Sequence, residues 1–400
     1  MRNTSFWSRL NSEEFLRSVR GKTYRHYPGT PGSLSDVFSW TALNDILRLH
    51  RLDSPRLRLA KEGRILPPEV FLKYDVNRRD PYKRIPKLQT ALLHRALRNG
   101  ATLILDAVDE LHAPVADLME DLETVFRVRP QVNLYAGWRT AHGFDIHWDD
   151  HDVVIAQIAG RKRWSVYAMT QPHPVARDKV SLRKPESDPL WEGLLNDGDL
   201  LYIPRGWWHA AVPLDEPTLH LTIGLSNPNG IDFLKWFVGE RKDCENLRRD
   251  LPLPGDEAER SEYMQALQKS LYERLTTETL GEYLAYRDER SRPRPHPALP
   301  WAATPAGLPA GDQGWSVRWI APREIPIRSE HDDSAISFKC HGKKFRFAGN
   351  ARSLIEGLMM RREFCFDEIC ALVPGASRAA VRNTIREMLD EELITIGQSA

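Results

Sequence analysis

The sequence predicts a mostly β fold with α additions, followed by a helical segment and a smaller C-terminal domain. Over about residues 1–230, short apolar stretches alternate with turn residues, which is typical of a barrel-like β domain. From Ile231 to Arg287 the apolar residues recur at helical spacing instead. Hydrophobic residues make up 41% of the 400, so the chain can bury a large core.

The clearest predicted strands lie near the middle of the β region. The apolar run from Val153 to Ile158 predicts a buried strand that ends at Gly160. A second strand covers Arg161–Tyr167, and Lys162 points to the opposite side of it from its two basic neighbours. At most one side of this basic run can therefore face the interior of the barrel.

A third predicted strand leads to an isolated histidine. Asp197-Gly198-Asp199 is a tight turn before the strand Leu200–Ile203, and Pro204-Arg205-Gly206 is the next turn. This arrangement puts His209 at the start of a further strand, near the mouth of the barrel.

Helical spacing predicts three helices in the same region. Leu43, Ile46 and Leu47 recur on one face of Ser39–His50, and residues 80–100 and 114–126 also read as helical. These helices are the α additions to the β domain.

Three side chains form the pattern of a metal site. In an extended strand, residues i and i+2 point to the same side, so His147 and Asp149 can reach one ion. With His209 they make a two-histidine, one-carboxylate set, which holds Fe(II) on one face and leaves positions open for a co-substrate and O₂. A His-x-Asp pair alone is also common in surface strands, where the two side chains simply hydrogen-bond.

Taken together, the segment around His147, the Gly-flanked basic strand and the IPRGWWH segment resemble the JmjC-type 2-oxoglutarate oxygenases. The resemblance is closest to the ribosomal oxygenase branch of protein hydroxylases and is specific over about residues 90–230. It implies a double-stranded β-helix (jelly-roll, cupin-type) core. It also implies a dioxygenase with Fe(II), 2-oxoglutarate as co-substrate and O₂, which hydroxylates a side chain of a protein or peptide, with ribosomal proteins as the first candidates.

The resemblance implies roles for individual residues. His147, Asp149 and His209 correspond to the iron ligands. Lys162 falls where the family has the cation that pairs with the distal carboxylate of 2-oxoglutarate; other members use Arg there. A solvated basic strand is the alternative for this lysine. A charge-assisted contact of this kind contributes about 1.5–3 kcal/mol.

Further polar residues are predicted to line the co-substrate pocket. Asn133 and Tyr135 resemble an Asn-x-Tyr pair of this branch, and their i, i+2 relation puts them on one side of a strand. Thr222 is a weaker candidate, because one sequence does not fix its register. Three other histidines, His142, His151 and His220, do not complete a better ligand spacing.

The C-terminal 170 residues or so are predicted to form three parts after the catalytic domain of residues 1–230. Residues 231–290 resemble the helical segment through which ribosomal oxygenases dimerise, so a homodimer is expected. Residues 291–309 are Pro-rich and read as a linker. Residues 310–400 look like a winged-helix domain, in which Ser377 caps a helix with one apolar stripe.

The winged-helix domain is not expected to bind DNA directly. Arg378, Arg382 and Arg386 form a ridge on its last helix, but residues 350–396 carry 6 Lys/Arg against 8 Asp/Glu, whereas a duplex-binding module should be basic. A structural or protein-interaction role is predicted. The first 100 residues are basic, with 20 Lys/Arg against 9 Asp/Glu, which suits an acidic or RNA-rich partner or an ordinary solvated surface.

Composition predicts a cytoplasmic protein without a membrane segment. The N-terminal sequence lacks the apolar stretch of a signal peptide, and no apolar run approaches the ~18 residues of a membrane span. The 4 cysteines form no Cys-x-x-Cys pair, so free thiols are expected. Two alternative functions stay open. One is the same chemistry on a biosynthetic peptide or small molecule, and the other is a non-catalytic cupin and winged-helix regulator.

Overall fold

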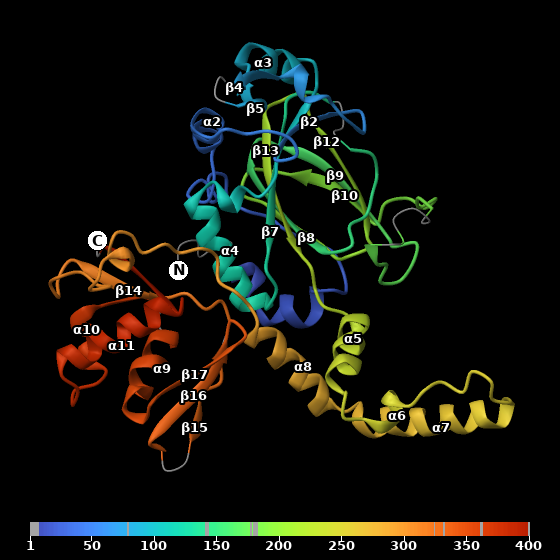
Figure 1. Cartoon of the computed structure of the whole chain (residues 1–400). Coiled ribbons are helices and arrows are strands. Elements are labelled where there is room, and N and C mark those ends of the chain that lie inside the picture. Colours follow the sequence, from blue (N-terminus) through green and yellow to red (C-terminus); the bar gives the residue numbers. More distant parts are fainter. Residues whose placement is uncertain are drawn as a thin grey trace. The chain divides into compact units, whose positions relative to one another are not determined.

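The computed structural model describes residues 8–77, 80–140, 144–176, 178, 183–323, 325–330, 333–360 and 363–398. The chain divides into two compact units, Met1–Asn227 and Pro228–Ala400. The predicted mostly β fold with helical additions is confirmed (Figure 1). In the described part of the chain, no helix combines the length and apolar character needed to cross a membrane.

Two antiparallel sheets form the framework of the first unit. The larger consists, in spatial order, of β1 (Arg25–Tyr27), β11 (Leu200–Ile203), β8 (Asp152–Ala159), β13 (Thr218–Leu225), β7 (Gln131–Gly137), β6 (Thr102–Leu105), β2 (Leu57–Lys61) and β3 (Arg64–Ile65). The smaller consists of β10 (Trp191–Leu195), β9 (Lys162–Tyr167) and β12 (Trp208–Pro213). Strands β8, β9 and β11 match the three strands predicted at Val153–Ile158, Arg161–Tyr167 and Leu200–Ile203 closely.

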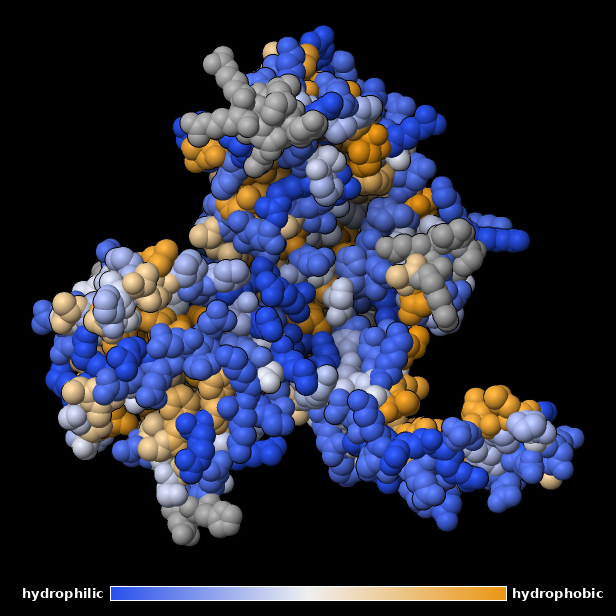
Figure 2. Space-filling view, in the orientation of Figure 1, coloured by the Kyte–Doolittle hydropathy of each residue, from blue (hydrophilic) through white to orange (hydrophobic). Residues whose placement is uncertain are grey.

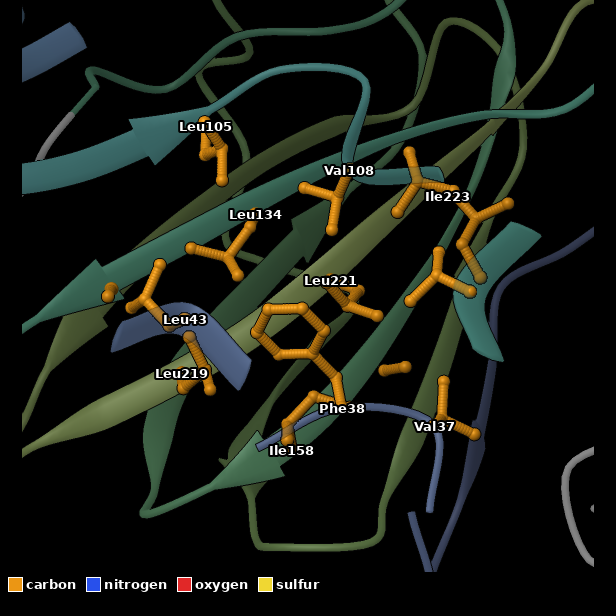
Figure 3. Packing of buried hydrophobic residues seen from close by; sticks show 14 of the residues in the cluster. Val37, Phe38, Leu43, Leu105, Val108, Leu134, Ile158, Leu219, Leu221 and Ile223 are labelled. Atoms are coloured by element: carbon orange, nitrogen blue, oxygen red, sulfur yellow. The ribbon is translucent and has the colours of Figure 1, made fainter. Parts of the chain in front are cut away.

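The two faces of the larger sheet have different surroundings. Alternate residues of β8 such as Val154 and Ile158 belong to a core shared with the helices, whereas Val153 and Ile155 pack against residues of β9, β10 and β11. Both sets are buried, which explains the uninterrupted apolar run in the sequence. Figure 3 shows the helix-side core, where Leu134 and Leu221 of the sheet surround Phe38.

This unit contains the helices α2 (Trp40–Leu49), α3 (Thr90–Arg98) and α4 (Ala113–Phe126), among others, and the short helical turns η1 (Phe15–Val19), η2 (Pro68–Val70) and η3 (Val108–Glu110). Ser39 caps α2 by accepting a hydrogen bond from the backbone N–H of Ala42 at 3.2 Å. The predicted helices at 39–50 and 114–126 are therefore present as α2 and α4.

The predicted helix over residues 80–100 is wrong in its first half. Residues Asp80–Leu88 form strand β5, which pairs antiparallel with β4 (Leu72–Asn77), and only α3 is helical. Pro86 lies inside this strand. Proline has no backbone N–H and clashes with the preceding helical turn, so an uninterrupted helix through this position is unfavourable.

The second unit starts with helices α5 (Gly230–Glu240), α6 (Glu245–Arg248), α7 (Glu257–Arg274) and α8 (Thr277–Glu289). Asn229 and Asp232 form a capping box at the start of α5. The helices after it are separated by a break that contains Pro252 and Pro254. The helical spacing in the sequence predicts this segment correctly.

The remainder of the second unit combines two three-stranded sheets with three helices. The strands are β14 (Trp315–Trp319), β15 (Arg328–Glu330), β16 (Ala335–Cys340), β17 (Lys343–Ala348), β18 (Glu363–Cys365) and β19 (Ile394–Gln398); the helices are α9 (Arg352–Met360), α10 (Phe366–Ala371) and α11 (Arg378–Asp390), with turns η5 (Trp301–Ala303) and η7 (Gly349–Ala351). Ser377 caps α11. The Pro-rich segment 291–309 contributes Ala298 and Leu308 to the core of this unit, so it is packed along part of its length.

Candidate metal centre and co-substrate pocket

Three potential metal ligands meet at the junction of the two sheets. The ligand atoms of His147, Asp149 and His209 lie within 4.8 Å of one another. Between the two histidines the backbones form an isolated antiparallel bridge, with N···O distances of 3.1 and 2.8 Å. Nε2 of His209 is 3.5 Å from Oδ2 of Asp149. The three residues that the sequence predicts as metal ligands thus lie together in one cluster.

Both imidazole rings are oriented by their own backbone. Nδ1 of His147 lies 2.8 Å from the carbonyl oxygen of Asp145, and Nδ1 of His209 lies 3.1 Å from that of Trp207. A carbonyl can only accept, so each Nδ1 carries the hydrogen and each Nε2 has a free lone pair. This is the tautomer that a histidine needs in order to bind a metal through Nε2.

Burial favours the neutral form of His209. Desolvation, together with the neighbouring His147, lowers the pKa of His209 to about 4. A histidine must be neutral to ligate a metal, so His209 needs no deprotonation near neutral pH.

A cavity of about 290 Å³ adjoins the three ligands. Its walls come from β2, β6, β7, β8, β9, β12 and β13, together with the segment around His147. It is lined by Arg58, Thr102, Asn133, Tyr135, Phe144, His147, Asp149, His151, Val153, Ile155, Lys162, Trp164, His209, Ala211, His220 and Thr222. The four predicted co-substrate residues, at positions 133, 135, 162 and 222, all lie on this wall.

Lys162 is the one residue of the predicted basic run that points into the cavity. It is 7% exposed, whereas Arg161 pairs with Glu216 and Arg163 pairs with Glu192 on the outside. Burial alone lowers the pKa of Lys162 to about 7. Among the described residues it has no ion-pair partner, so the cavity holds a desolvated ammonium group that an anionic ligand would stabilise.

Further polar groups on the cavity wall also lack partners. His220 stacks on Tyr135 with ring centroids 5.1 Å apart, and its edge contacts Trp164. In the described structure, Nδ1 of His220 and Nε1 of Trp164 are buried without a hydrogen-bond partner. Burial, assisted by the charge of Lys162, lowers the pKa of His220 well below its ordinary value. Since buried polar groups are normally paired, these atoms fit a cavity that accepts a polar ligand.

The other pocket residues are held by cross-strand pairing. Asn133 of β7 lies opposite Thr222 of β13, and Oδ1 of Asn133 accepts a hydrogen bond from the N–H of Ala107 at 3.3 Å. Burial raises the pKa of Tyr135 to about 12, so its hydroxyl stays protonated. His151 also lines the cavity, while His142 lies outside the described residues.

Trp164 was missed as a wall residue in the sequence. The signal was available, because Trp164 is two residues after Lys162 and therefore shares its face of β9. Arg58 was missed as well; its guanidinium contacts both carboxylate oxygens of Asp106 at 2.7 and 2.6 Å. Arg58 lies on β2, far from the other cavity residues in the sequence, and no sequence motif around it points to the cavity.

Comparison with known proteins supports this assignment of the fold. The family model of the JmjC domain matches residues 109–233. Residues 109–233 are thus similar to a JmjC domain. The predicted recognition is thereby confirmed.

Curated relatives are similar over a larger share of the chain. The bifunctional lysine-specific demethylase and histidyl-hydroxylase NO66 of Drosophila persimilis is 27% identical over 259 residues, which cover 60% of this chain and 34% of that protein. The ribosomal oxygenase 1 of Gallus gallus is 25% identical over 277 residues, covering 64% of this chain and 46% of that protein. The chain thus spans less than half the length of these relatives.

Solved structures match over nearly the whole chain. The ribosomal oxygenase YcfD of Escherichia coli superposes with a TM-score of 0.56 at 17% identity, covering 96% of this chain and 97% of that one. A structure of YcfD with cobalt and 2-oxoglutarate gives a TM-score of 0.55 at 17% identity, with the same coverage. At this identity the likeness establishes the fold.

Proposed function

We propose that this protein is an Fe(II)- and 2-oxoglutarate-dependent oxygenase that hydroxylates a side chain of a protein, with ribosomal proteins as the first candidates. The observation that carries the proposal is the combination of two oriented imidazoles and a carboxylate with a buried lysine that has no ion-pair partner among the described residues. The names of the relatives, histidyl-hydroxylase and ribosomal oxygenase, agree with this class of reaction.

Different residues of the cavity would bind the metal and the co-substrate. His147, Asp149 and His209 would hold the metal through Nε2, a carboxylate oxygen and Nε2. The ammonium group of Lys162 would bind the distal carboxylate of 2-oxoglutarate, and the unpartnered atoms of His220 and Trp164 offer further polar contacts in the same cavity. When bound, Fe(II) with 2-oxoglutarate and O₂ supplies the oxidising chemistry.

The geometry of the wall defines what the chain itself contributes. Lys162 and His209 are buried on strands β9 and β12, and the backbone bridge between His147 and His209 holds the segment of the other two ligands, so these side chains keep their positions before any ligand arrives. The apolar residues Val153 and Ile155 exclude water beside the polar groups. An anion in this cavity is therefore oriented by a charge that bulk solvent does not screen.

The test is a paired turnover and substrate experiment. Purified wild-type protein should convert 2-oxoglutarate to succinate in the presence of Fe(II), and His209→Ala should lose this turnover while keeping the wild-type circular dichroism spectrum. Mass spectrometry of the proteome from a deletion strain should show the loss of a one-oxygen mass increment, with ribosomal proteins examined first. Near-normal turnover in His209→Ala would contradict the proposal.

We further propose that α5–α8, within residues 231–290, form a dimerisation segment. On α5, Ile231, Leu234 and Val238 are 46%, 47% and 51% exposed at helical spacing. Hydrophobic patches lie over this helical part of the molecule (Figure 2). Exposed apolar surface of this kind normally marks an interface, and two-fold symmetry is its commonest arrangement. Light scattering should give twice the chain mass of 46.0 kDa, and a mass near that value would contradict the dimer.

We also propose that residues 310–400 are a winged-helix domain used for protein contacts, after a linker at 291–309 and a catalytic domain of residues 1–230. Arg378 is paired with Asp312 and Asp367, and Arg382 is paired with Asp312. Two of the three arginines on the predicted ridge are therefore neutralised by carboxylates. This supports the expectation that direct DNA binding is not the role of the domain.

A further inference from the structure

A buried carboxylate, Asp152, lies beside the metal ligands but is not one of them. It is 3% exposed and begins β8, three residues after Asp149. Its Oδ1 accepts a hydrogen bond from the backbone N–H of Arg205 at 2.8 Å. Its Oδ2 accepts from the hydroxyl of Tyr202 at 2.8 Å and from Nδ2 of Asn227 at 2.7 Å. Three donors from two other segments of the chain thus converge on one side chain.

The Arg205 contact fixes the turn that leads to His209. The next backbone N–H, that of Gly206, donates to the carbonyl oxygen of Asp149 at 2.9 Å. Two successive amides of the turn are therefore bound to the segment that carries a metal ligand, one through a side chain and one through the backbone. His209 follows only three residues later, so a shift of the turn would move its imidazole.

Glycine is required where the turn is clamped. Gly206 has φ +82°, and a Cβ at this position would lie 2.4 Å from the ring of Pro174. The turn therefore has little freedom on its outer side as well. Its position therefore depends on the hydrogen bonds from Arg205 to the Asp152 carboxylate and from Gly206 to the backbone carbonyl of Asp149.

The charge of Asp152 is compensated nearby. Nη2 of Arg20 donates to Oδ1 of Asn227 at 2.8 Å, while the amide of Asn227 donates to Asp152. Burial lowers the pKa of the Arg20 guanidinium, and the carboxylate of Asp152 opposes this. Burying a carboxylate without partners costs free energy. Asp152 is hydrogen-bonded at both oxygens and interacts electrostatically with Arg20, which offsets this cost.

We propose that Asp152 is a positioning residue for the metal site. It clamps the Pro204–Gly206 turn onto the segment of Asp149 and thereby sets the distance between His209 and the other two ligands. The inference rests on the proposed metal function. Residues that orient metal ligands from outside commonly change the metal affinity by about 10- to 100-fold when they are removed.

The test measures metal affinity together with stability. Co(II) is titrated into the metal-free full-length protein, and the dissociation constant, the visible absorption spectrum of the bound Co(II) and the Tm of the metal-free protein are recorded. Asp152→Ala should weaken Co(II) binding by about 10- to 100-fold and alter the spectrum. Asp152→Asn retains an oxygen that can accept from the N–H of Arg205, so it should recover most of the affinity.

Tyr202→Phe is the matched control, because it removes a hydrogen bond to the other carboxylate oxygen and leaves the Arg205 contact in place. It should lower the Tm but keep the dissociation constant within about threefold of wild type, since the turn is still clamped. A second loss variant, Asp152→Ser, is too short to reach the turn yet keeps a polar atom for the buried donors. It decides the question if Asp152→Ala does not fold.

Two results would overturn the role of Asp152: wild-type Co(II) affinity in both loss variants, or an equal loss of affinity in Tyr202→Phe. In the second case the effect would follow from lowered stability alone. Failure of the proposed function is distinguishable, because the wild-type protein itself would then bind no Co(II).

Discussion

The two faces of the larger sheet differ in chemistry although they share the same strands. In β13, Leu219, Leu221 and Ile223 face the helix-side core and are fully buried among apolar residues, whereas His220 and Thr222 face the cavity. In β7, Leu134 likewise alternates with two polar cavity residues. Neighbours in the sequence thus belong to opposite environments. The helix-side face stabilises the fold through apolar packing, while the cavity face carries polar groups that can bind a ligand.

The cavity face is expected to lower the stability of the unliganded protein. Lys162 and His220 are buried, and in the described structure the ammonium group lies 5.7 Å from the ring centroid of Trp164 without an ion-pair partner, while Nδ1 of His220 has no hydrogen-bond partner. Burying such groups costs free energy that the apolar face must offset. Substitutions on the two faces should therefore separate stability from ligand binding.

The largest effect on stability is expected from the apolar face. Leu221→Ala removes a fully buried side chain and should lower the free energy of unfolding by about 2–5 kcal/mol. The KM for 2-oxoglutarate should stay near the wild-type value at a temperature where the variant is folded, because Leu221 does not line the cavity. Urea denaturation and turnover assays measure the two quantities. A large rise in KM would show that the two faces are not independent.

On the cavity face, Lys162→Ala should raise the KM for 2-oxoglutarate by roughly 10- to 100-fold, because it removes a contact worth about 1.5–3 kcal/mol. Lys162→Arg should recover part of the affinity. Arg163→Ala is the control. Arg163 lies on the outer side of β9, where it pairs with Glu192, so its removal should leave the KM for 2-oxoglutarate unchanged.

Replacing Lys162 by an apolar side chain should weaken co-substrate binding but stabilise the metal-free protein. Since burial lowers the pKa of Lys162 to about 7, the unfolded chain binds its proton more tightly than the folded one between about pH 7 and the ordinary lysine value. The cost of the buried lysine is fully present below pH 7 and disappears as the pH rises through that window. Lys162→Met should therefore raise the Tm of the metal-free protein at pH 7, and a lowered Tm would contradict this account of the cavity face.

How far these features could be predicted depends on whether their cause is local. The buried strand β8, the position of His209 at a strand start and the inward direction of Lys162 follow from alternation and turn residues in a short window. Residues 80–88 were misread as helix, because their pairing with β4 is not local. The contacts of Asp152 cannot be predicted from a short window either, since its partners come from two distant segments, around Tyr202–Arg205 and at Asn227.

The register of Thr222 shows a further limit. The pairing of β13 with β8 shifts between Leu219 and His220, where a bulge adds a residue on one side. A one-residue shift exchanges the two faces of a strand, so the side on which Thr222 lies cannot be read from alternation alone. The structure puts it opposite Asn133 on the cavity wall.

The protonation of Lys162 should also appear in the pH dependence of co-substrate binding. Only the ammonium form attracts a carboxylate, so the dissociation constant for 2-oxoglutarate should rise by roughly 20-fold between pH 6.5 and 8.5 if the pKa of the free protein is about 7. Lys162→Arg should remove most of this dependence, because arginine stays charged throughout the range. Calorimetric titration across this range measures both proteins, and an equal slope in the two would assign the dependence to another group.

The smallest effect is expected at Thr222, the cavity-side neighbour of Leu221. Thr222→Val keeps the volume of the side chain and removes only the hydroxyl group, so it should raise the KM for 2-oxoglutarate by about two- to tenfold, the equivalent of one hydrogen bond of roughly 0.5–1.5 kcal/mol. The unfolding free energy should change little, in contrast to Leu221→Ala one position earlier, because no apolar contact is lost. Thr222→Ser retains the hydroxyl and should keep the wild-type KM. If Thr222→Val also keeps the wild-type KM, the hydroxyl does not contact the co-substrate, and the polar role of this face is confined to Lys162 and the rings around it.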